Sequence, residues 1–321
     1  MATIPWTEKY RPKTLKEVID QKDIVQSLKN VVESRAVPHM LFVGPAGVGK
    51  TASAHALARD LYGDGYMSEG MFVEINASDE RGLQTVREKV KLFARSQAFG
   101  EVGFRIILLD ESDQLTEDAQ HALRRIMEQF SSNCRFTLVA NYSNRVIEPI
   151  QSRCATFRFR LLPKKIVTKY LAEIAKKESL KATDAALETV YDLSNGDLRK
   201  CINALQAASS LSKSIDESVV YKVMGYVDRG EVQRMLELAA SGEFLKSREV
   251  LRQMLYYDGV AGRDILDTIF RQIFRMKISD RRKMLLVDQL GEVDHRISEG
   301  ASEEIQLSAF LAKIPLTERA G

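Results

Sequence analysis

The sequence predicts an α/β domain built on a doubly wound parallel sheet, followed by two helical domains. Five short apolar runs alternate with helical patterns in the first half of the chain, at residues 40–43, 72–76, 105–110, 135–141 and 156–160. Such alternation is typical of a parallel sheet with helices on both faces. After residues 162–163 (Leu-Pro) the strand signals stop and helical periodicity takes over. We therefore expect an α/β domain over residues 1–162, a small helical domain over 163–226 and an all-α domain over 227–321.

The helices expected between the strands are amphipathic. An alanine-rich helix follows the first strand at residues 52–61, and two longer helices are expected at 82–98 and 117–130. Thr116 can cap the last of these, because a threonine hydroxyl accepts a hydrogen bond from the first turn. The apolar stripes expected to face the core are Leu83, Val86, Val90, Phe93 and Ala94 on one helix, and Ala119, Ala122, Leu123, Ile126, Met127 and Phe130 on the other.

Helical periodicity continues through the second half without any group of residues suited to catalysis. Helices are expected at 166–179, 185–194 and 198–211, and a further helical block runs from about 218 to 315. The apolar repeats of that block are Val232, Met235, Leu236, Leu238 and Ala239, then Ile265, Ile269, Ile273 and Phe274. An all-helical block without chemistry suggests a role in assembly.

The first expected strand is followed directly by GPAGVGKT, a pattern that can wrap the phosphates of a nucleotide. Gly44, Gly47 and Gly49 allow close backbone approach, so N–H groups can converge on phosphate oxygens at a helix N-terminus. Lys50 can reach the β and γ phosphates, and Thr51 offers a hydroxyl to Mg²⁺. The expected nucleotide contacts here are Gly44, Pro45, Ala46, Gly47, Val48, Gly49, Lys50, Thr51 and Ala52. A glycine-rich turn that matches by chance is the alternative, but the strand before and the helix after favour a site for ATP or GTP.

The third expected strand, in the segment RIILLDESD, ends in two carboxylates that can complete a hydrolytic site. Parallel sheets place ligands at the carboxyl ends of their strands. We expect Asp110 to hold Mg²⁺ and Glu111 to orient, or accept a proton from, the attacking water. An ordinary strand that ends in a solvated acidic loop is the alternative. The phosphate-binding pattern upstream favours the hydrolytic site.

Composition and charge fit a folded protein without membrane or secretory segments. The chain has 321 residues, of which 45% are hydrophobic and 28% charged, so it is long enough for two or three domains. No apolar run approaches the ~20 residues that cross a bilayer, and the polar first 13 residues lack the apolar core of a secretory signal. We expect a protein of the cytoplasm or nucleoid, with no membrane partner. Cys134, Cys154 and Cys201 contain no CxxC pair, so neither a disulfide framework nor a zinc site is expected.

Six further motifs accompany the phosphate-binding pattern: WTEKYRP (6–12), NASDERG (76–82), DESD (110–113), ALRRIME (122–128), SRC (152–154) and GDLR (196–199). With them the chain resembles AAA+ ATPases and, within that class, the small subunits of the replication factor C clamp loader, most of all the archaeal ones. The resemblance covers essentially the whole chain. It implies an AAA+ domain, a lid and a collar, with ATP and Mg²⁺ as cofactors. It also implies a heteropentamer with a large subunit and further small subunits, which opens a sliding clamp of the PCNA type and loads it onto primed DNA.

The resemblance implies roles for residues outside the phosphate-binding segment. For the adenine pocket it implies Tyr10, Arg11, Pro12, Val18 and Gln21, with an N-terminal arm that packs on the domain as the alternative. Asn141 matches the polar sensor of the attacking water or the γ phosphate; a strand-terminal asparagine that caps a turn is the alternative. Arg199 matches the lid sensor of the γ phosphate, against an ordinary solvated arginine. ATP rather than GTP also follows from the resemblance, since no Asn-Lys-x-Asp segment follows the fourth strand.

Arg153 has an implied role that depends on assembly. The resemblance places it in the ATP site of the neighbouring subunit, as an arginine finger. A planar, permanently charged guanidinium suits the transition-state charge of a phosphoryl group. A surface arginine before the fifth strand is the alternative. The ATPase is then completed by the neighbour and stimulated by DNA and the clamp.

Contacts with DNA and the clamp are inferred from two helices. Basic residues near the start of one and on the polar side of the next can contact phosphates without reading bases; they are Arg81, Arg87, Lys91, Arg124 and Arg125. A solvated helix face is the alternative for each, since acidic residues interrupt the cluster. Phe93 and Phe99 match the region where such loaders touch the clamp. Phe99 is the better candidate, because Phe93 also lies on the expected core stripe.

Other functions remain as alternatives. A ring scaffold with little hydrolysis should have lost Lys50, Glu111 or Arg153, and none is lost. A protein-unfolding motor should carry an aromatic-apolar-glycine loop after the second strand, where this chain has the charged residues 77–81. Another DNA-processing AAA+ ATPase, such as an initiator or a branch-migration motor, should end in a basic DNA-binding module, whereas the last helical block mixes charges. The lack of a long basic tail after residue 315 favours a small subunit.

Overall fold

The computed structural model describes residues 4–78, 84, 86–96, 102–225, 228–276 and 278–315. Contacts between Cα atoms divide the chain into two units, one of Met1–Lys177 with Val190–Gln206 and one of Glu178–Thr189 with Ala207–Gly321. The expected boundaries of three domains at 162 and 226 stay a prediction. Among the described residues, no helix is both long and apolar enough to cross a membrane.

The first unit contains the five expected strands, and their bounds are β1 Met40–Val43, β2 Phe72–Asn76, β3 Arg105–Asp110, β4 Cys134–Ala140 and β5 Ala155–Arg158. Its helical segments are α1 Trp6–Lys9, η1 Leu15–Glu17, α2 Lys22–Ser34, α3 Lys50–Tyr62, η2 Val86–Val90, α5 Lys91–Arg95, η3 Ser112–Gln114, α6 Glu117–Gln129, η4 Ser143–Arg145, α7 Glu148–Gln151 and α8 Lys164–Lys177. The helices α9 Asp184–Leu193 and α10 Leu198–Leu211 each have residues in both units.

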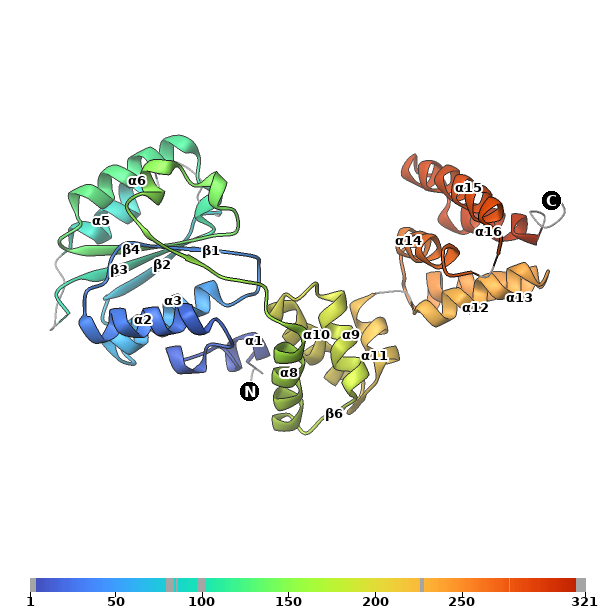
Figure 1. The fold of residues 1–321 in the computed structure, drawn as a ribbon, viewed down its shortest axis with the longest axis horizontal. Helices are drawn as coiled ribbons and strands as arrows, with labels where there is room; N and C mark the ends of the chain where they lie inside the picture. Colours follow the sequence, from blue (N-terminus) through green and yellow to red (C-terminus); the bar gives the residue numbers. More distant parts are fainter. Residues whose placement is uncertain are drawn as a thin grey trace. The chain divides into compact units, whose positions relative to one another are not determined.

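The sheet of the first unit is parallel, with the strand order β2-β3-β4-β1-β5. Helices α2 and α3 cover one face, and α5 and α6 cover the other (Figure 1). The predicted doubly wound α/β fold is therefore confirmed. In this register the last residue of β2, Asn76, lies opposite Asp110 of β3, so both strands end at the same edge.

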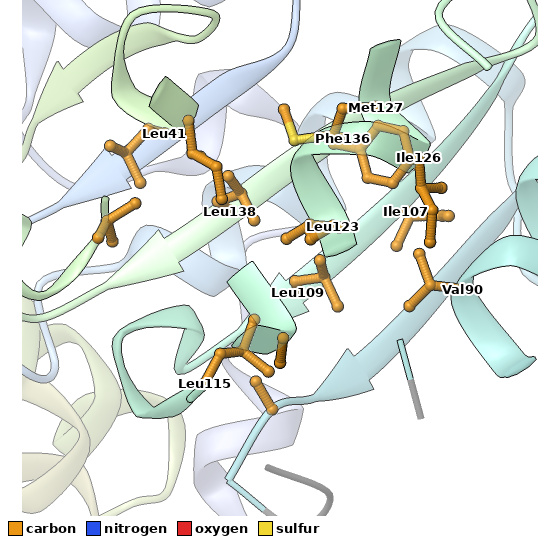
Figure 2. Close-up of a cluster of buried hydrophobic side chains, with 14 of the residues drawn as sticks. Leu41, Val90, Ile107, Leu109, Leu115, Leu123, Ile126, Met127, Phe136 and Leu138 are labelled. Carbon is orange, nitrogen blue, oxygen red and sulfur yellow. The ribbon is translucent and has the colours of Figure 1, made fainter. Parts of the chain in front are cut away.

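Alternate residues of each strand supply the two apolar layers. Leu41, Leu109 and Leu138 face α6, where Leu123 and Met127 complete one buried cluster (Figure 2). The neighbouring strand residues pack on α2 and α3 in a second cluster, which includes Phe42, Ile106, Leu108, Leu28 and Leu57. Full burial of such a side chain contributes roughly 1.5–3 kcal/mol, so the two apolar layers stabilise the sheet whose carboxyl edge carries the site.

Of the two long helices expected between the strands, one is present as predicted and the other is not. Helix α6 has the expected start, because the hydroxyl of Thr116 accepts a hydrogen bond from the amide of Ala119 at 3.4 Å. The helix expected over 82–98 is instead a π-helical turn, η2, followed by the short α5. Val90 and Ala94 are buried as expected. Leu83, Arg81 and Phe99 lie outside the described residues.

The second unit is helical apart from a two-residue parallel pair that the sequence did not predict, β6 Lys181–Ala182 with β7 Ser214–Ile215. Its helices are α11 Glu217–Met224, α12 Arg229–Ala240, α13 Phe244–Arg252, η5 Gln253–Tyr257, α14 Gly262–Ile273, α15 Asp280–Ser298 and α16 Glu303–Lys313. Ile265, Ile269 and Ile273 are buried in the cluster that holds α12 to α16 together. Of the apolar repeats, Phe274 is exposed and Leu238 is half-buried, whereas the other members are buried in that cluster.

Cys134 and Cys201 are buried and Cys154 is half-buried, each as a free thiol. Burial raises the pKa of both Cys134 and Cys154 to about 12, so these thiols stay protonated near neutral pH.

Candidate nucleotide site

A pocket at the N-terminus of α3 brings together most of the residues expected to bind a nucleotide. Its walls come from the N-terminal arm, the phosphate-binding loop and the start of α10. The lining residues are Thr7, Glu8, Tyr10, Arg11, Pro12, Val18, Ile19, Gly47, Val48, Gly49, Lys50, Thr51, Ala52, Leu162, Tyr170, Leu198, Arg199 and Ile202. All of these belong to the first unit. Gly44, Pro45, Ala46, Gln21 and Asn141 do not line this pocket.

The glycines of the loop have backbone conformations that other residues rarely adopt. Gly47 and Gly49 have φ of 70° and 95°, in the left-handed region. A Cβ on Gly47 would lie 1.9 Å from Oδ1 of Asp197, and the amide of Leu198 donates to the carbonyl of Gly47 at 3.2 Å. The turn before α10 therefore packs directly on the loop, which brings Arg199 to the pocket.

Lys50 lies at the centre of the loop. Its ammonium donates to the carbonyl oxygens of Gly44 and Pro45, each at 2.7 Å, and to Oδ1 of Asn141 at 3.0 Å. Burial lowers the pKa of Lys50 to about 8, and the nearby carboxylates of Asp110 and Asp113 only partly oppose that effect. The contact also shows where the Asn141 side chain lies: it faces the lysine at the end of β4.

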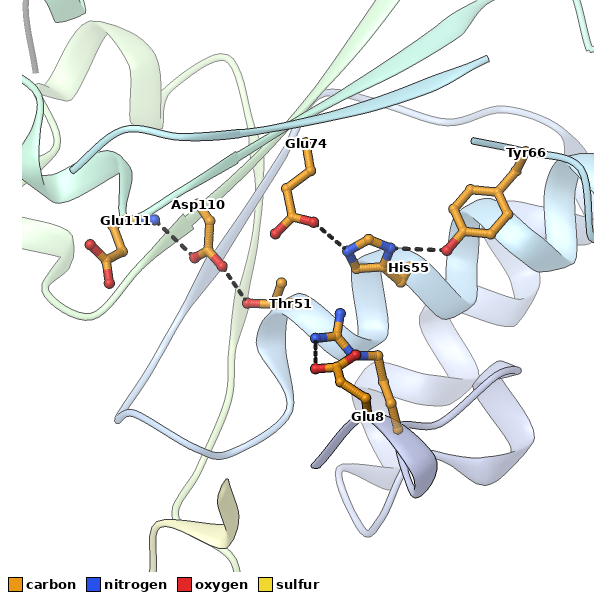
Figure 3. Close-up of polar contacts among 8 residues, drawn as sticks. Glu8, Thr51, His55, Tyr66, Glu74, Asp110 and Glu111 are labelled. Carbon is orange, nitrogen blue, oxygen red and sulfur yellow. Dashed lines mark hydrogen bonds and ion pairs between the residues drawn. The ribbon is translucent and has the colours of Figure 1, made fainter. Parts of the chain in front are cut away.

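Thr51 and Asp110 meet at the carboxyl edge of the sheet. The hydroxyl of Thr51 donates to Oδ2 of Asp110 at 2.8 Å, and Oδ1 of the same carboxylate accepts from the amide of Glu111 at 2.9 Å (Figure 3). Hydroxyl and carboxylate oxygens are ligands that Mg²⁺ prefers, with water and phosphate oxygens as the others. Among the described residues, no group of three or more His, Cys, Asp or Glu could hold a metal alone. This pair therefore fits a magnesium ion that is shared with a nucleotide.

Glu111 follows in a left-handed backbone conformation, with φ of 54°. Such a conformation is unfavourable for a residue with a side chain and recurs at functional sites. It turns the chain sharply from β3 into η3, so that the carboxylates of Asp110 and Glu111 point in different directions (Figure 3).

Asp113 and Gln120 are site-supporting residues that the sequence analysis missed. The buried carboxylate of Asp113 accepts from the amides of Asn141 and Tyr142, each at 3.2 Å, and so positions the end of β4. Gln120 is buried and connects α6 to the last residue of η4, Arg145, through its carbonyl oxygen, and to the amide of Ile147 just beyond. The sequence offered two signals for them: Asp113 is the last acidic residue of the DESD motif, and Gln120 is a polar residue next to the apolar stripe of α6.

The N-terminal arm reaches the pocket as expected, but Gln21 does not face it. The hydroxyl of Tyr170 donates to the carbonyl of Tyr10 at 3.0 Å. The buried side chain of Gln21 instead donates to the carbonyl of Arg160 at 2.7 Å and accepts from its amide at 3.2 Å. Gln21 thus anchors the arm to the segment after β5.

Arg153 lies outside this chain's own pocket. Its guanidinium contacts Oε1 of Glu128 at 2.6 Å and the carbonyl of Pro149 at 2.8 Å. Arg124 contacts the same oxygen of Glu128 at 3.1 Å. The side chain of Arg153 is 36% exposed, so it can reach a molecule outside the chain.

The basic residues expected to contact DNA are only partly described. A surface groove between α5 and α6 is lined by Lys91, Asp118, His121, Ala122, Arg125, Ile126 and Gln129. Arg124 is not part of that groove. The side chain of Arg87 is outside the described part, and Phe93 packs at the edge of the core with Arg105 over its ring.

Three family models match the chain in sequence order. They are the ATPase family associated with various cellular activities (AAA) over residues 40–161, the RCF1/5-like, AAA+ ATPase lid domain over 169–210, and the replication factor C C-terminal domain over 227–313. The first of these spans the five strands and the phosphate-binding loop, and the second includes the start of α10.

Relatives and solved structures were also found. Replication factor C small subunits of Sulfurisphaera tokodaii and Archaeoglobus fulgidus are 51% and 49% identical, over 97% and 96% of this chain and 95% and 96% of theirs. Among solved structures, the RuvB Holliday junction branch migration motor of Thermotoga maritima is 20% identical, with a TM-score of 0.54 over 71% of this chain and 78% of that chain. That structural likeness concerns the fold alone.

Proposed function

The chain belongs to the replication factor C small-subunit family, and on this premise we propose how its pocket works in a clamp loader. The chain is an AAA ATPase subunit of a clamp loader, which binds ATP. The observation that carries the proposed chemistry is the hydrogen bond from the Thr51 hydroxyl to the Asp110 carboxylate. It lies next to the phosphate-binding loop, whose carbonyl oxygens hold the ammonium of Lys50.

Each polar group of the pocket has a proposed task. Lys50 exchanges its carbonyl partners for the β and γ phosphates, and Asn141 moves with it to contact the γ phosphate or the attacking water. Thr51 and Asp110 hold Mg²⁺, which when bound neutralises charge on the phosphates. Glu111 orients the water and accepts its proton.

The remaining contacts select and sense the nucleotide. We assign Tyr10, Arg11, Pro12 and Val18 to the adenine, because these residues line the pocket beside the loop. Arg199 contacts the γ phosphate from the start of α10. Since the amide of Leu198 donates to the carbonyl of Gly47 in the phosphate-binding loop, loss of the γ phosphate would alter the position of α10 directly.

The site is completed by a neighbouring subunit. Arg153 does not line its own pocket, and the groups that it contacts, Glu128 and the carbonyl of Pro149, are partly exposed. We propose that it enters the ATP site of the next subunit, where such an arginine contributes roughly 10³–10⁵ in rate. The subunits form a heteropentamer with one large subunit, and hydrolysis is stimulated by primed DNA and the sliding clamp.

Assembly is proposed to use the second unit. Phe270 of α14 and Phe274, the residue directly after that helix, lie edge to face, with ring centroids 5.2 Å apart, and are 43% and 54% exposed. An exposed aromatic pair of this kind is typical of an interface. We propose that a neighbouring subunit covers it.

DNA contact is proposed for the groove that contains Lys91 and Arg125. Replacing both with glutamate should lower DNA-stimulated hydrolysis and flatten its salt dependence, because fewer counterions are then released. The matched control replaces two basic residues of α15, Lys283 and Arg296, with glutamate, which changes the charge by the same amount away from the groove. If stimulation by DNA survives the first pair, another surface makes the contact.

The overall test is ATP hydrolysis by the chain with its large subunit, with and without primed DNA and clamp. We expect stimulation by both together, and its loss in Lys50→Ala. Equal, appreciable rates in all mixtures would contradict stimulation by DNA and clamp, whereas negligible hydrolysis in all of them would favour a ring scaffold.

A further inference from the structure

A buried histidine on α3 takes no part in the mechanism proposed above. His55 is 6% exposed and lies four residues after Thr51, so both side chains project from the same face, one turn apart. Its Nδ1 lies 3.0 Å from the hydroxyl of Tyr66, and its Nε2 lies 2.9 Å from Oε2 of Glu74 (Figure 3). The ring also packs on Phe72, with centroids 5.0 Å apart.

The hydrogen bonds of this histidine are fully satisfied. The hydrogen bond from His55 holds the pKa of Glu74 below its usual value, so the carboxylate is ionised and can only accept. Nε2 of His55 therefore carries the proton. Nδ1 faces a tyrosine hydroxyl, which can donate or accept. A buried imidazole is costly unless its ring nitrogens are paired, and here its two partners, the half-buried Tyr66 and the partly exposed Glu74, come from the segment after α3 and from β2.

The network joins α3 to the strand beside the acidic one. Glu74 lies opposite Leu108 of β3, two residues before Asp110. Helix α3 is thus attached to the sheet at two points one helical turn apart, by Thr51 to Asp110 at the carboxyl edge and by His55 to Glu74 in the middle of β2. Two attachments fix the rotation of a helix about its axis, which one attachment does not.

We propose that His55 is a positioning residue for the metal site. Through Glu74 it sets the rotation of α3, and so the direction in which the Thr51 hydroxyl faces Asp110. The proposal rests on the proposed function, in which these two residues hold Mg²⁺. Positioning within a fraction of an ångström is what a site for small, strictly octahedral Mg²⁺ requires.

The test is equilibrium binding of a fluorescent ATP analogue, with excess Mg²⁺ and with EDTA, by the full chain. In EDTA, His55→Leu should bind the analogue within about twofold of the affinity of the unaltered chain. The Mg²⁺ gain, which is the ratio of the affinity with Mg²⁺ to that with EDTA, should fall by about tenfold. His55→Gln, whose amide can still donate to Glu74, should recover most of the gain. Tyr62→Phe is the control, because it removes a buried hydrogen bond to Phe104 at the other end of α3.

Two results would overturn the inference. One is a Mg²⁺ gain in His55→Leu equal to that of the unaltered chain; the other is an equal loss with and without Mg²⁺, as expected of a merely structural residue. If His55→Leu fails to fold, Glu74→Ala should reproduce the selective loss, and a normal Mg²⁺ gain there contradicts the proposal. Absence of any Mg²⁺ gain in the unaltered chain would instead remove the proposed metal site itself.

Discussion

The guanidinium of Arg153 and the carboxylate of Glu128 form an ion pair of 2.6 Å on the surface of the first unit. Both side chains are more than a third exposed, and the same carboxylate oxygen also contacts Arg124. Exposed ion pairs of this kind are weak and screened by salt. The pair can therefore break at little cost when Arg153 meets another group, as its proposed role in a neighbouring subunit requires.

This weakness predicts how the lone chain responds to Arg153→Ala. Because little stability depends on an exposed pair, the melting temperature should change by no more than about 2 °C. ATP affinity should also be unchanged, since Arg153 does not line the pocket. Scanning calorimetry and nucleotide binding check both points. A large loss in either would mean that the arginine acts within its own subunit.

The lowered pKa of Lys50 predicts a pH dependence of ATP binding. In the free chain the ammonium loses its proton near pH 8, whereas phosphates bind the charged form. Binding above about pH 8 must therefore take up a proton, and the Kd for ATP should rise by up to about tenfold per pH unit. Below pH 7 the lysine is charged in both states and this dependence should vanish.

The measurement is calorimetric titration at pH 7, 8 and 9, in buffers of different ionisation enthalpy. Lys50→Arg is the control, because an arginine stays charged over this range. This variant should bind ATP more weakly, with an affinity that changes little between pH 7 and pH 9. A flat profile for the unaltered chain, without proton uptake, would show that the lysine stays charged in the free pocket.

Asp113 should matter for both stability and hydrolysis. Asp113→Ala leaves the amides of Asn141 and Tyr142 without their acceptor at the end of β4, which should cost about 2–3 kcal/mol. Since Asn141 then loses its position, ATP hydrolysis should fall more than ATP binding. Denaturant unfolding and steady-state kinetics give the two values. Asp267→Ala, on an exposed position of α14, is the matched control and should cost less than about 0.5 kcal/mol. Equal effects of the two changes would mean that Asp113 does not support the sensor.

Gly47 should tolerate no side chain. In Gly47→Ala the new Cβ strains a left-handed residue and meets Asp197, so the turn that brings Arg199 to the pocket must shift. We expect at least a tenfold loss of ATP affinity. Gly225→Ala has similar backbone strain, at φ of 65°, but open space around it, so ATP affinity should not change. Normal ATP binding by Gly47→Ala would show that the turn before α10 moves without consequence.

Local patterns predicted much of the fold and the phosphate-binding loop. The strands at 40–43, 72–76 and 105–110 have the predicted bounds, because each apolar run is short and ends at a turn or a polar residue. The Thr51–Asp110 bond was within reach of the sequence as well, since parallel strands end at one edge. The π-helical turn at η2 was not, because nothing in its amphipathic stripe distinguishes it from an α-helix.

Residues that act through distant partners were beyond the sequence analysis. Gln21 bonds to Arg160, which lies 139 residues further along the chain, and its polar side chain alone did not distinguish an anchor from a pocket wall. His55 lies within the alanine-rich helix and Glu74 within an ordinary strand pattern. Only the packing of α3 on β2 makes them a pair.

The most direct test of the account is ATP hydrolysis by the assembled loader in which this subunit carries Arg153→Ala. With primed DNA and clamp present, we expect a loss of at least about 100-fold at the sites that receive this arginine, while ATP binding stays normal. An unchanged stimulated rate, in a complex shown to be intact, would contradict the claim that neighbouring subunits complete each other's sites.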